Sequence, residues 1–176
     1  MPNPINSDNQ VQVLVFKVGP HQACLPLENV IQVFDSVSYE PPPEHLTGPG
    51  LGPDFKLDPL PGVLGIINVR GQDVPLVDLR PRWNLPVKQV SLTDQLIVMR
   101  AGGTTVSIMT DQVMGTRTYP RRKIFPLRRI LPGEAPHAAV AETDGIMILF
   151  DSDSLFSSET LAAFESINRS RRHERE

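Results

Sequence analysis

The sequence predicts an all-β fold built from two similar barrel subdomains packed side by side, and three observations support this. Short apolar segments recur about every ten residues between Gly- and Pro-containing turns, which is typical of sandwiches and barrels. The chain repeats itself, because residue 13 aligns with residue 96 at an offset of 83 and residue 78 aligns with residue 151 at an offset of 73. A helical pattern occurs only near the C-terminus. The duplication indicates two related units, with a binding surface where they meet.

The first copy of the repeat contains two predicted hairpins and one further extended segment. Its predicted strands cover residues 11–18, 23–27, 30–34, 63–69 and 74–79. The first strand is rich in β-branched and aromatic side chains and ends at the turn residues Gly19 and Pro20. The second hairpin turns at Arg70 and Gly71. The change of offset follows from extra residues in a Pro/Gly-rich segment of the first copy.

The second copy repeats these strands and ends in the one predicted helix. Its strands are expected at residues 96–100, 105–110, 138–141 and 146–150. Residues 157–168 are predicted to be helical because Leu161, Phe164 and Ile167 fall on one face at a spacing of three. Ser158 is the expected capping residue.

The domain boundaries follow from changes in composition. Residues 1–10 are polar and expected to be disordered, residues 11–168 form the folded domain, and residues 169–176 form a charged tail. Within the domain, residues 41–62 form a Pro/Gly-rich insertion that is either a functional loop or a tolerated one. We expect no signal peptide and no direct membrane insertion, because no apolar stretch reaches the length of a spanning helix.

The charge balance argues against a nucleic-acid partner. The net charge is −3 and the pI is about 5.8, whereas nucleic-acid binding usually needs a basic face. The basic run at residues 121–129 is the best candidate for a polyanion site. The alternative, that it is a solvated crossover anchoring Ile124 and Leu127 in the core, is favoured because the run is short and its flanks are acidic.

Motifs for catalysis, cofactors and metals are absent from the sequence. It has no GxSxG, GxxxxGK[ST], HExxH or GxGxxG pattern, and its four histidines lack metal-ligand spacing. Cys24 lies in an apolar run and is expected to be a buried small side chain. Asp151 and Asp153 follow a strand, where turn capping is the commoner role. We therefore predict no catalytic residue, no cofactor and no metal.

One segment resembles a known family. Residues 65–80 read Gly-Ile-Ile-Asn-Val-Arg-Gly-Gln-Asp-Val-Pro-Leu-Val-Asp-Leu-Arg, which closely resembles the CheW family pattern. The resemblance extends over residues 11–164. It implies two SH3-like five-stranded β-barrels and a noncatalytic chemotaxis adaptor that couples chemoreceptors to a CheA-type histidine kinase. It also implies a cytoplasmic protein associated with membrane chemoreceptor arrays through its partners.

The resemblance further implies two binding surfaces. An apolar groove between the barrels would take the cytoplasmic tip of the receptor, and a separate barrel face would pack on the regulatory domain of the kinase. Ile67 could add apolar surface to the groove. The implied receptor-binding residues are Val30, Gln32, Val33, Gly65, Asn68, Arg70, Gly71 and Val113. Arg70 would lie beside the groove, with Asn68 holding its turn and Gly71 supplying the backbone shape.

Gln32 departs from the family pattern, which commonly has a Glu that pairs with the arginine. A neutral amide can still accept a hydrogen bond from Arg70, or Arg70 has a different partner here. The departure leaves open whether the receptor and kinase belong to the main chemotaxis system or to an alternative pathway. Two other functions stay open: a localisation or oligomerisation adaptor without a kinase partner, and a small-barrel nucleic-acid-binding protein.

Overall fold

The computed structural model describes residues 9–41, 62–126, 138–152 and 155–170. The expected disordered N-terminus up to residue 8, most of the Pro/Gly-rich insertion, Leu127 in the basic run, Asp153 and the tail from residue 171 lie outside the described residues. The first strand begins at Gln10 and the C-terminal helix ends at Ser170, so regular structure reaches slightly beyond residues 11–168 at both ends.

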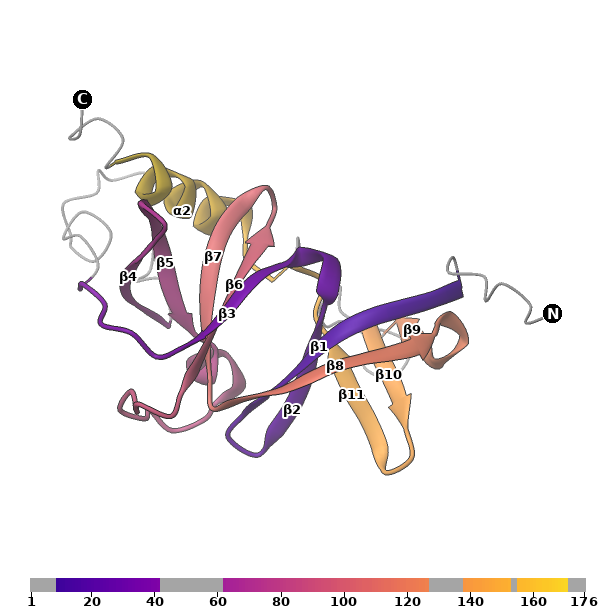
Figure 1. Cartoon of the computed structure of the whole chain (residues 1–176). Coiled ribbons are helices and arrows are strands. Elements are labelled where there is room, and N and C mark those ends of the chain that lie inside the picture. The colour runs from indigo at the N-terminus through magenta and orange to yellow at the C-terminus, as the bar shows by residue number, and fades with distance from the viewer. Residues whose placement is uncertain (1–8, 42–61, 127–137, 153–154, 171–176) are drawn as a thin grey trace.

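Two β-sheets and one C-terminal helix make up the described fold, as the sequence predicts. Barrel A has the strand order β8-β1-β2-β11-β10-β9, and barrel B has the order β3-β6-β7-β5-β4 (Figure 1). The strands of barrel A are β1 (Gln10–Val18), β2 (His21–Pro26), β8 (Gln112–Pro120), β9 (Ile124–Pro126), β10 (Ala138–Glu142) and β11 (Gly145–Leu149). Those of barrel B are β3 (Val30–Asp35), β4 (Val63–Val69), β5 (Gln72–Asp78), β6 (Gln95–Ala101) and β7 (Thr104–Thr110). The helix is α2 (Ser158–Ser170).

Each barrel contains strands from both copies of the repeat. In barrel A, β1 and β2 of the first copy pair with β8 and β11 of the second. In barrel B, β6 and β7 of the second copy pair with β3 and β5 of the first. Figure 1 shows β3 leaving the region of β1 and β2 and crossing to the other barrel. The duplication therefore does not assign one copy to one barrel, and the two barrels are joined by exchanged strands.

A close backbone contact joins the two ends of barrel B. Glu40, which follows β3, exchanges two backbone hydrogen bonds with Ile66 of β4, at 2.8 and 2.9 Å. Gly65 makes this contact possible, because a Cβ at that position would lie 2.0 Å from the carbonyl oxygen of Glu40. Gly65 is thus fixed by the packing of the barrel wall.

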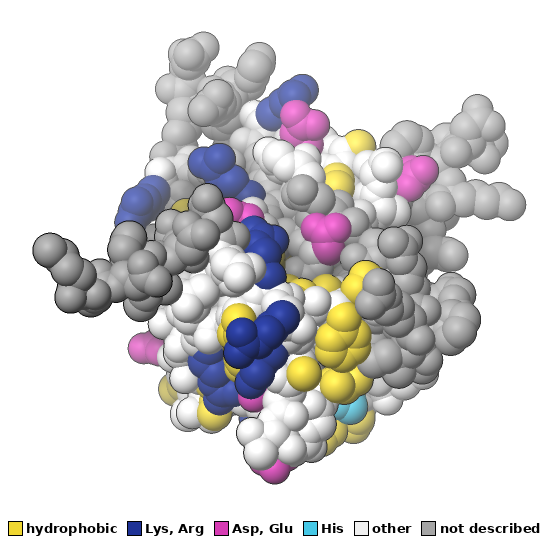
Figure 2. Space-filling view, turned by 90° about the vertical axis from the view of Figure 1, so that its right-hand side faces the viewer, with side chains coloured by type: hydrophobic (Ala, Val, Ile, Leu, Met, Phe, Trp, Pro, Cys, Tyr) yellow, Lys and Arg dark blue, Asp and Glu magenta, His cyan; other side chains and the backbone are white. Residues whose placement is uncertain are grey.

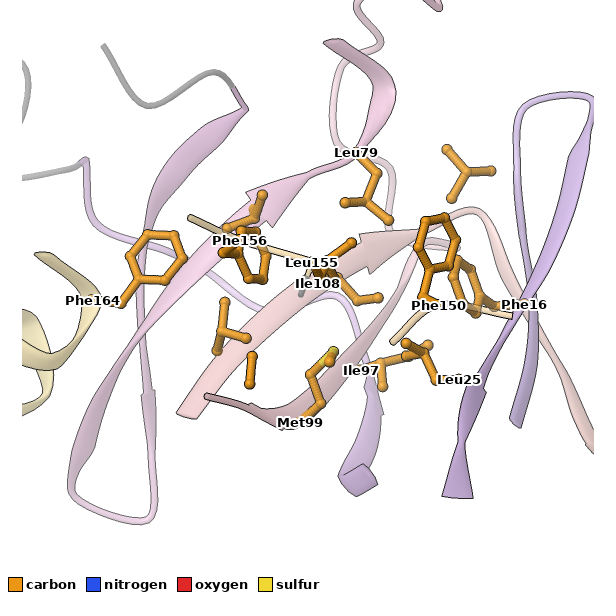
Figure 3. Packing of buried hydrophobic residues seen from close by; sticks show 14 of the residues in the cluster. Phe16, Leu25, Leu79, Ile97, Met99, Ile108, Phe150, Leu155, Phe156 and Phe164 are labelled. Atoms are coloured by element: carbon orange, nitrogen blue, oxygen red, sulfur yellow. The ribbon is translucent and has the colours of Figure 1, made fainter. Parts of the chain in front are cut away.

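The buried side chains form three clusters, and the largest lies between the barrels. Smaller clusters lie within barrel A, around Val15 and Val140, and within barrel B, around Leu76 and Val98. The large cluster, which we call the shared core, combines residues of both barrels with residues of α2 and the segment before it. Figure 3 shows it as a band that runs from Phe16 and Leu25 through Ile97 and Ile108 to Phe156 and Phe164.

The shared core explains why the strands that border it are apolar without alternation. Along β1, Val13 and Val15 pack inside barrel A, whereas Leu14, Phe16 and Val18 pack in the shared core. A strand that is buried on both faces reads as a continuous apolar run. The space where the barrels meet is therefore largely filled by the protein's own side chains.

The capping residue of α2 lies one residue before the one that the sequence pattern suggests. The Ser157 hydroxyl accepts a hydrogen bond from the Thr160 amide at 3.2 Å, so the cap is Ser157 and not the expected Ser158. Ala163, Phe164 and Ile167 of the helix are buried in the shared core. The spacing of apolar residues predicts where the helix lies. The capping residue depends on which serine oxygen accepts a hydrogen bond from the first turn.

Candidate functional site

The turn between β4 and β5 displays Arg70 on a fixed backbone. Arg70 and Gly71 have φ angles of 53° and 84°, as in the two-residue hairpin turn of type I′. The Asn68 side chain accepts a hydrogen bond from the Gly71 amide at 3.0 Å and donates one to the Asp73 carboxylate at 3.3 Å. A Cβ on Gly71 would meet nothing within 4 Å, so the backbone conformation alone favours glycine there.

Arg70 is exposed and borders a recess of about 410 Å³ beside α2. The recess is lined by residues of the β4–β5 turn, the β6–β7 turn and the end of α2, among them Thr104 and Arg169. Asn168 of α2 donates a hydrogen bond to the Thr105 carbonyl at 3.3 Å. We name this space the Arg70 recess. It contains charged side chains of both signs, since Asp73 also borders it.

The apolar residues of the predicted site lie on β3 and β8. Val30, Val33 and Val113 are partly buried and pack against the edge of the shared core. The Val113 amide donates a hydrogen bond to the Gln95 side chain at 2.7 Å, which fixes the start of β8. These residues come from the two strands that pass from one barrel to the other. By contrast, Ile67 is 1% exposed and points into barrel B, so it offers no surface for a partner.

The structure reveals two exposed apolar residues that the sequence reasoning missed. The register of β3 shifts at Ile31 and that of β8 shifts at Met114, so each residue lies in a bulge. Their exposed fractions are 46% and 44%. The offset of 83 places Ile31 on Met114, so a comparison of the two copies contained the signal that could have found them.

Gln32 does not accept a hydrogen bond from Arg70 in this structure. Its Oε1 atom is buried and has no hydrogen-bond partner among the described residues. Gln32 lies opposite Val98, which faces the interior of barrel B. The predicted site residues thus fall into three places: the β4–β5 turn, the edges of β3 and β8, and the wall of barrel B at Gly65.

A network of charged residues ties the end of the first copy to the second copy. Arg80 donates hydrogen bonds to both carboxylate oxygens of Asp111, at 2.6 and 2.7 Å, with its side chain only 8% exposed. Lys88 bridges Asp111 at 2.9 Å and also contacts the buried Asp94. The Gly19 amide adds a hydrogen bond to Asp111 at 2.6 Å. Sequence reasoning missed this network because its members are far apart in the chain.

The network sets the charge states of its members. Burial favours the neutral form of Asp111, but hydrogen bonds from Lys88, Arg80 and the Gly19 amide outweigh it and lower its pKa to about 2. Burial raises the pKa of Asp78, whose Oδ1 accepts a hydrogen bond from the Arg80 backbone amide at 3.0 Å. Asp78 therefore holds the backbone at the start of the 3-10 helix η3 (Arg80–Trp83). These carboxylates serve the fold.

Cys24 and the described part of the basic run, which the sequence singled out, belong to barrel A. Burial raises the pKa of the Cys24 thiol to about 12, so the thiolate is scarce. Arg121–Lys123 of the basic run form the short 3-10 helix η4, and Ile124 packs against the core of barrel A. In Figure 2, which shows the side of the molecule that carries barrel A, Lys and Arg side chains form several separate groups with Asp and Glu side chains among them.

The described part of the chain offers neither a cluster of metal ligands nor a membrane-spanning helix. No group of three or more His, Cys, Asp or Glu side chains there is placed to hold a metal ion. None of its helices combines the length and apolar character needed to span a membrane.

Comparison with known proteins adds to this geometry. A family model described as the CheW-like domain matches residues 54–160. A protein named "Chemotaxis protein CheW" from Rhizobium meliloti (strain 1021) is 26% identical over 151 residues, which cover 84% of this chain and 88% of that protein. A protein of the same name from Helicobacter pylori (strain ATCC 700392 / 26695) is 21% identical over 126 residues, or 72% of this chain and 68% of that protein.

A solved structure shares the fold. The crystal structure of scaffolding protein TtCheW from Thermoanaerobacter tengcongensis matches with a TM-score of 0.64 and 20% sequence identity. The match covers 81% of this chain and 90% of that one. The prediction of two SH3-like barrels with a short C-terminal helix is therefore confirmed.

Proposed function

The chain belongs to the family of CheW-like domains, and from this premise we propose that it is a noncatalytic chemotaxis adaptor coupling chemoreceptors to a CheA-type histidine kinase. In this proposal it binds the cytoplasmic tip of the receptor with one surface and the regulatory domain of the kinase with another. It acts in the cytoplasm, at membrane chemoreceptor arrays that it reaches through these partners. Its relatives from Rhizobium meliloti and Helicobacter pylori carry the name of chemotaxis proteins.

The observation that carries the proposal is the exposed Arg70 on its rigid turn. The side chain has no described ion-pair partner, and the hydrogen bond from the Gly71 amide to Asn68 fixes the backbone that carries it. An unpaired guanidinium can donate several hydrogen bonds to a partner's carboxylates or carbonyls. Arg70 therefore suits the role of a polar anchor for a receptor helix, while apolar residues at the edges of β3 and β8 supply contact area.

The proposed mechanism is positional. The shared core and the Arg80–Asp111 pair hold the two barrels in one arrangement, so partners bound on different faces keep a defined spacing. A receptor change at one face can then alter the equilibrium between kinase conformations at another face. Such coupling requires the adaptor to be stiff, and interdigitated cores transmit displacement rather than absorbing it.

The test compares Arg70→Glu with the matched variant Arg122→Glu, which reverses an exposed charge on η4. In arrays reconstituted from the receptor and kinase of the same organism, Arg70→Glu should abolish receptor-dependent kinase activation, and Arg122→Glu should retain it. Calorimetry against the kinase regulatory domain should give the same affinity for both. Full activation with Arg70→Glu would overturn the assignment of the turn to the receptor. Absence of binding to any resident kinase would instead favour an adaptor for localisation.

A further inference from the structure

The two barrels have matching clefts, each between two parallel strands that separate at their starts. In barrel B, β5 and β7 pair from Leu76 and Ser107 onward, so their first residues lie apart. In barrel A, β2 and β11 pair only at Ala23 with Ile148 and at Cys24 with Leu149. The offsets of 83 and 73 relate the strands around one cleft to those around the other.

In barrel B the cleft is bordered and partly covered by α2. Asn168 bonds to Thr105 at the start of β7. Leu161 packs over the turn at Gly102, so closely that a Cβ on this glycine would lie 2.5 Å from the leucine Cδ1. Phe164, with no exposed surface, anchors the helix in the shared core. What remains open there is the polar Arg70 recess.

In barrel A a much shorter segment takes the place of the helix. The segment that follows β5 forms the 3-10 helix η3 (Arg80–Trp83), and Leu85 then packs over the turn at Gly19. Trp83 stacks on Phe150 with ring centroids 5.5 Å apart. We call α2 with the segment before it the cap of barrel B, and η3 with Leu85 the cap of barrel A. The offset of 73 places Trp83 on Phe156, which precedes α2, so the two caps begin alike. The cap of barrel A stops at Asn84, whose φ of 53° ends the helical turn.

The incomplete cap leaves an apolar pocket of about 580 Å³. Its apolar lining consists of Pro20, Ala23, Trp83, Ile146, Met147 and Ile148. Ile146 is 52% exposed, and the rings of His21 and Trp83 meet in a T-shaped contact with centroids 5.9 Å apart. Large apolar side chains that line a concave space are typical of binding sites.

The rim of this pocket is acidic. Asp144 of the β10–β11 hairpin lines it and has no ion-pair partner among the described residues, whereas Glu142 of the same hairpin pairs with Arg117 at 3.2 Å. No Lys or Arg is among its described lining residues. The Arg70 recess differs, because Arg70 and Arg169 both border it. The two clefts therefore have equivalent positions in the fold and different chemistry, and a basic ligand would complement the pocket in barrel A.

We propose that this pocket is a docking site for an amphipathic helix of a partner protein, with Lys or Arg residues flanking its apolar face. The seat of α2 on barrel B is the internal precedent, since it shows that a helix covers this kind of cleft. The protein's own α2 from a second copy fits less well, because its apolar residues Phe164 and Ile167 are already buried in the shared core. The site lies on barrel A, away from the Arg70 turn, and the inference goes beyond the proposed function.

The test is a calorimetric and NMR titration of the full chain with two synthetic 14-residue peptides. Both carry Leu at helical positions i, i+3, i+4 and i+7, and they differ in having either Lys or Glu at the flanking positions. We expect the Lys peptide to bind, with amide shifts at Ala23, Ile146 and Ile148, and the Glu peptide to bind at least tenfold more weakly.

Three variants locate the binding. Ile146→Gln should weaken binding of the Lys peptide at least tenfold, and Asp144→Lys should weaken it several-fold. Leu92→Gln, which changes a side chain that is 91% exposed elsewhere, should leave binding unchanged. Melting curves establish that each variant folds. These measurements need neither receptor nor kinase, so their failure is distinct from a failure of the proposed function.

Several results would overturn the inference. The Lys peptide could fail to bind, both peptides could bind equally, or the amide shifts could be confined to residues of the Arg70 recess. Sedimentation of the protein without peptide measures whether the chain associates with itself. Self-association that disappears in Ile146→Gln would assign the pocket to a second copy of the chain. The proposal of a helix from a partner protein would then be wrong.

Discussion

Barrel B is covered by a thirteen-residue helix, whereas barrel A is covered at the equivalent position by one turn of 3-10 helix. The strands before these caps match at an offset of 73, so the difference arises in the short segments that follow β5 and β11. After β11, Ser157 caps a run of helix-forming residues. After η3, Asn84 adopts a left-handed conformation and Pro86 disfavours helix in the residue before it. A few residues thus determine whether a helix covers the cleft of a barrel or leaves it open.

The comparison predicts that the two caps contribute unequally to stability. Phe164 is fully buried in the shared core, and Phe164→Ala should lower the free energy of unfolding by about 4 kcal/mol. Trp83 borders an open pocket and is partly exposed, so Trp83→Ala should cost less than half as much. Urea unfolding followed by circular dichroism measures both. Equal losses would mean that the short cap is as firmly packed as the helix.

The charged network that joins the copies should have the next largest effect. Asp111→Ala leaves the buried Arg80 guanidinium without its carboxylate, which should lower the free energy of unfolding by about 3 kcal/mol. The control is Glu165→Ala, which removes the exposed pair of Glu165 with Arg169 and should cost under about 0.5 kcal/mol. Urea unfolding compares the two, and similar losses would show that the network adds nothing to the joining of the barrels.

The same carboxylate makes stability depend on pH. The pKa of Asp111 falls from about 4 in the unfolded chain to about 2 in the folded protein, so its contribution is complete above about pH 4. As the pH drops toward 2, the folded carboxylate takes up a proton and roughly 2 kcal/mol is lost. Urea midpoints between pH 6 and pH 2.5 follow this loss. Asp111→Asn should flatten this part of the profile, and an unchanged slope would assign it to other groups.

The smallest predicted effect concerns the hydrogen bond between Ser157 and Thr160 at the start of α2. Ser157→Ala removes the acceptor for the Thr160 amide and should cost about 1 kcal/mol, and Ser158→Ala should cost less. Hydrogen exchange should speed up in the first turn of α2 and stay unchanged in barrel A. Faster exchange in both barrels would indicate that the helix end supports the whole fold.

The sequence predicts local features well and long-range ones poorly. The Arg70-Gly71 turn and the C-terminal helix follow from short patterns, because a hairpin turn and an apolar helix face depend on neighbouring residues. The exchange of strands does not, because it pairs strands that lie far apart in the chain, such as β1 with β8 and β3 with β6. The pairing of Arg80 with Asp111 likewise joins residues 31 positions apart that no motif connects.

For the candidate site, the sequence identified residue types but not their surroundings. It placed Gly65 among binding residues, which stays a prediction, and the structure adds that the missing Cβ of Gly65 admits Glu40 to the wall of barrel B. It passed over Ile31 and Met114, because a bulge exposes a side chain that alternation would bury or pair. The pocket beside Trp83 was also missed, because it is bounded by two hairpins and by a cap that ends early.

The exchange of strands between the copies also imposes an order on synthesis. The hairpin of β1 and β2 leaves the ribosome before the other described strands, yet its neighbours β8 and β11 are encoded about a hundred residues later. Barrel B has all its strands once Thr110 has emerged, so it can close while the first hairpin still waits for partners. Such distant pairings slow folding and prolong the exposure of apolar strand edges. Of the described strands, the first to be translated are therefore among the last to be buried.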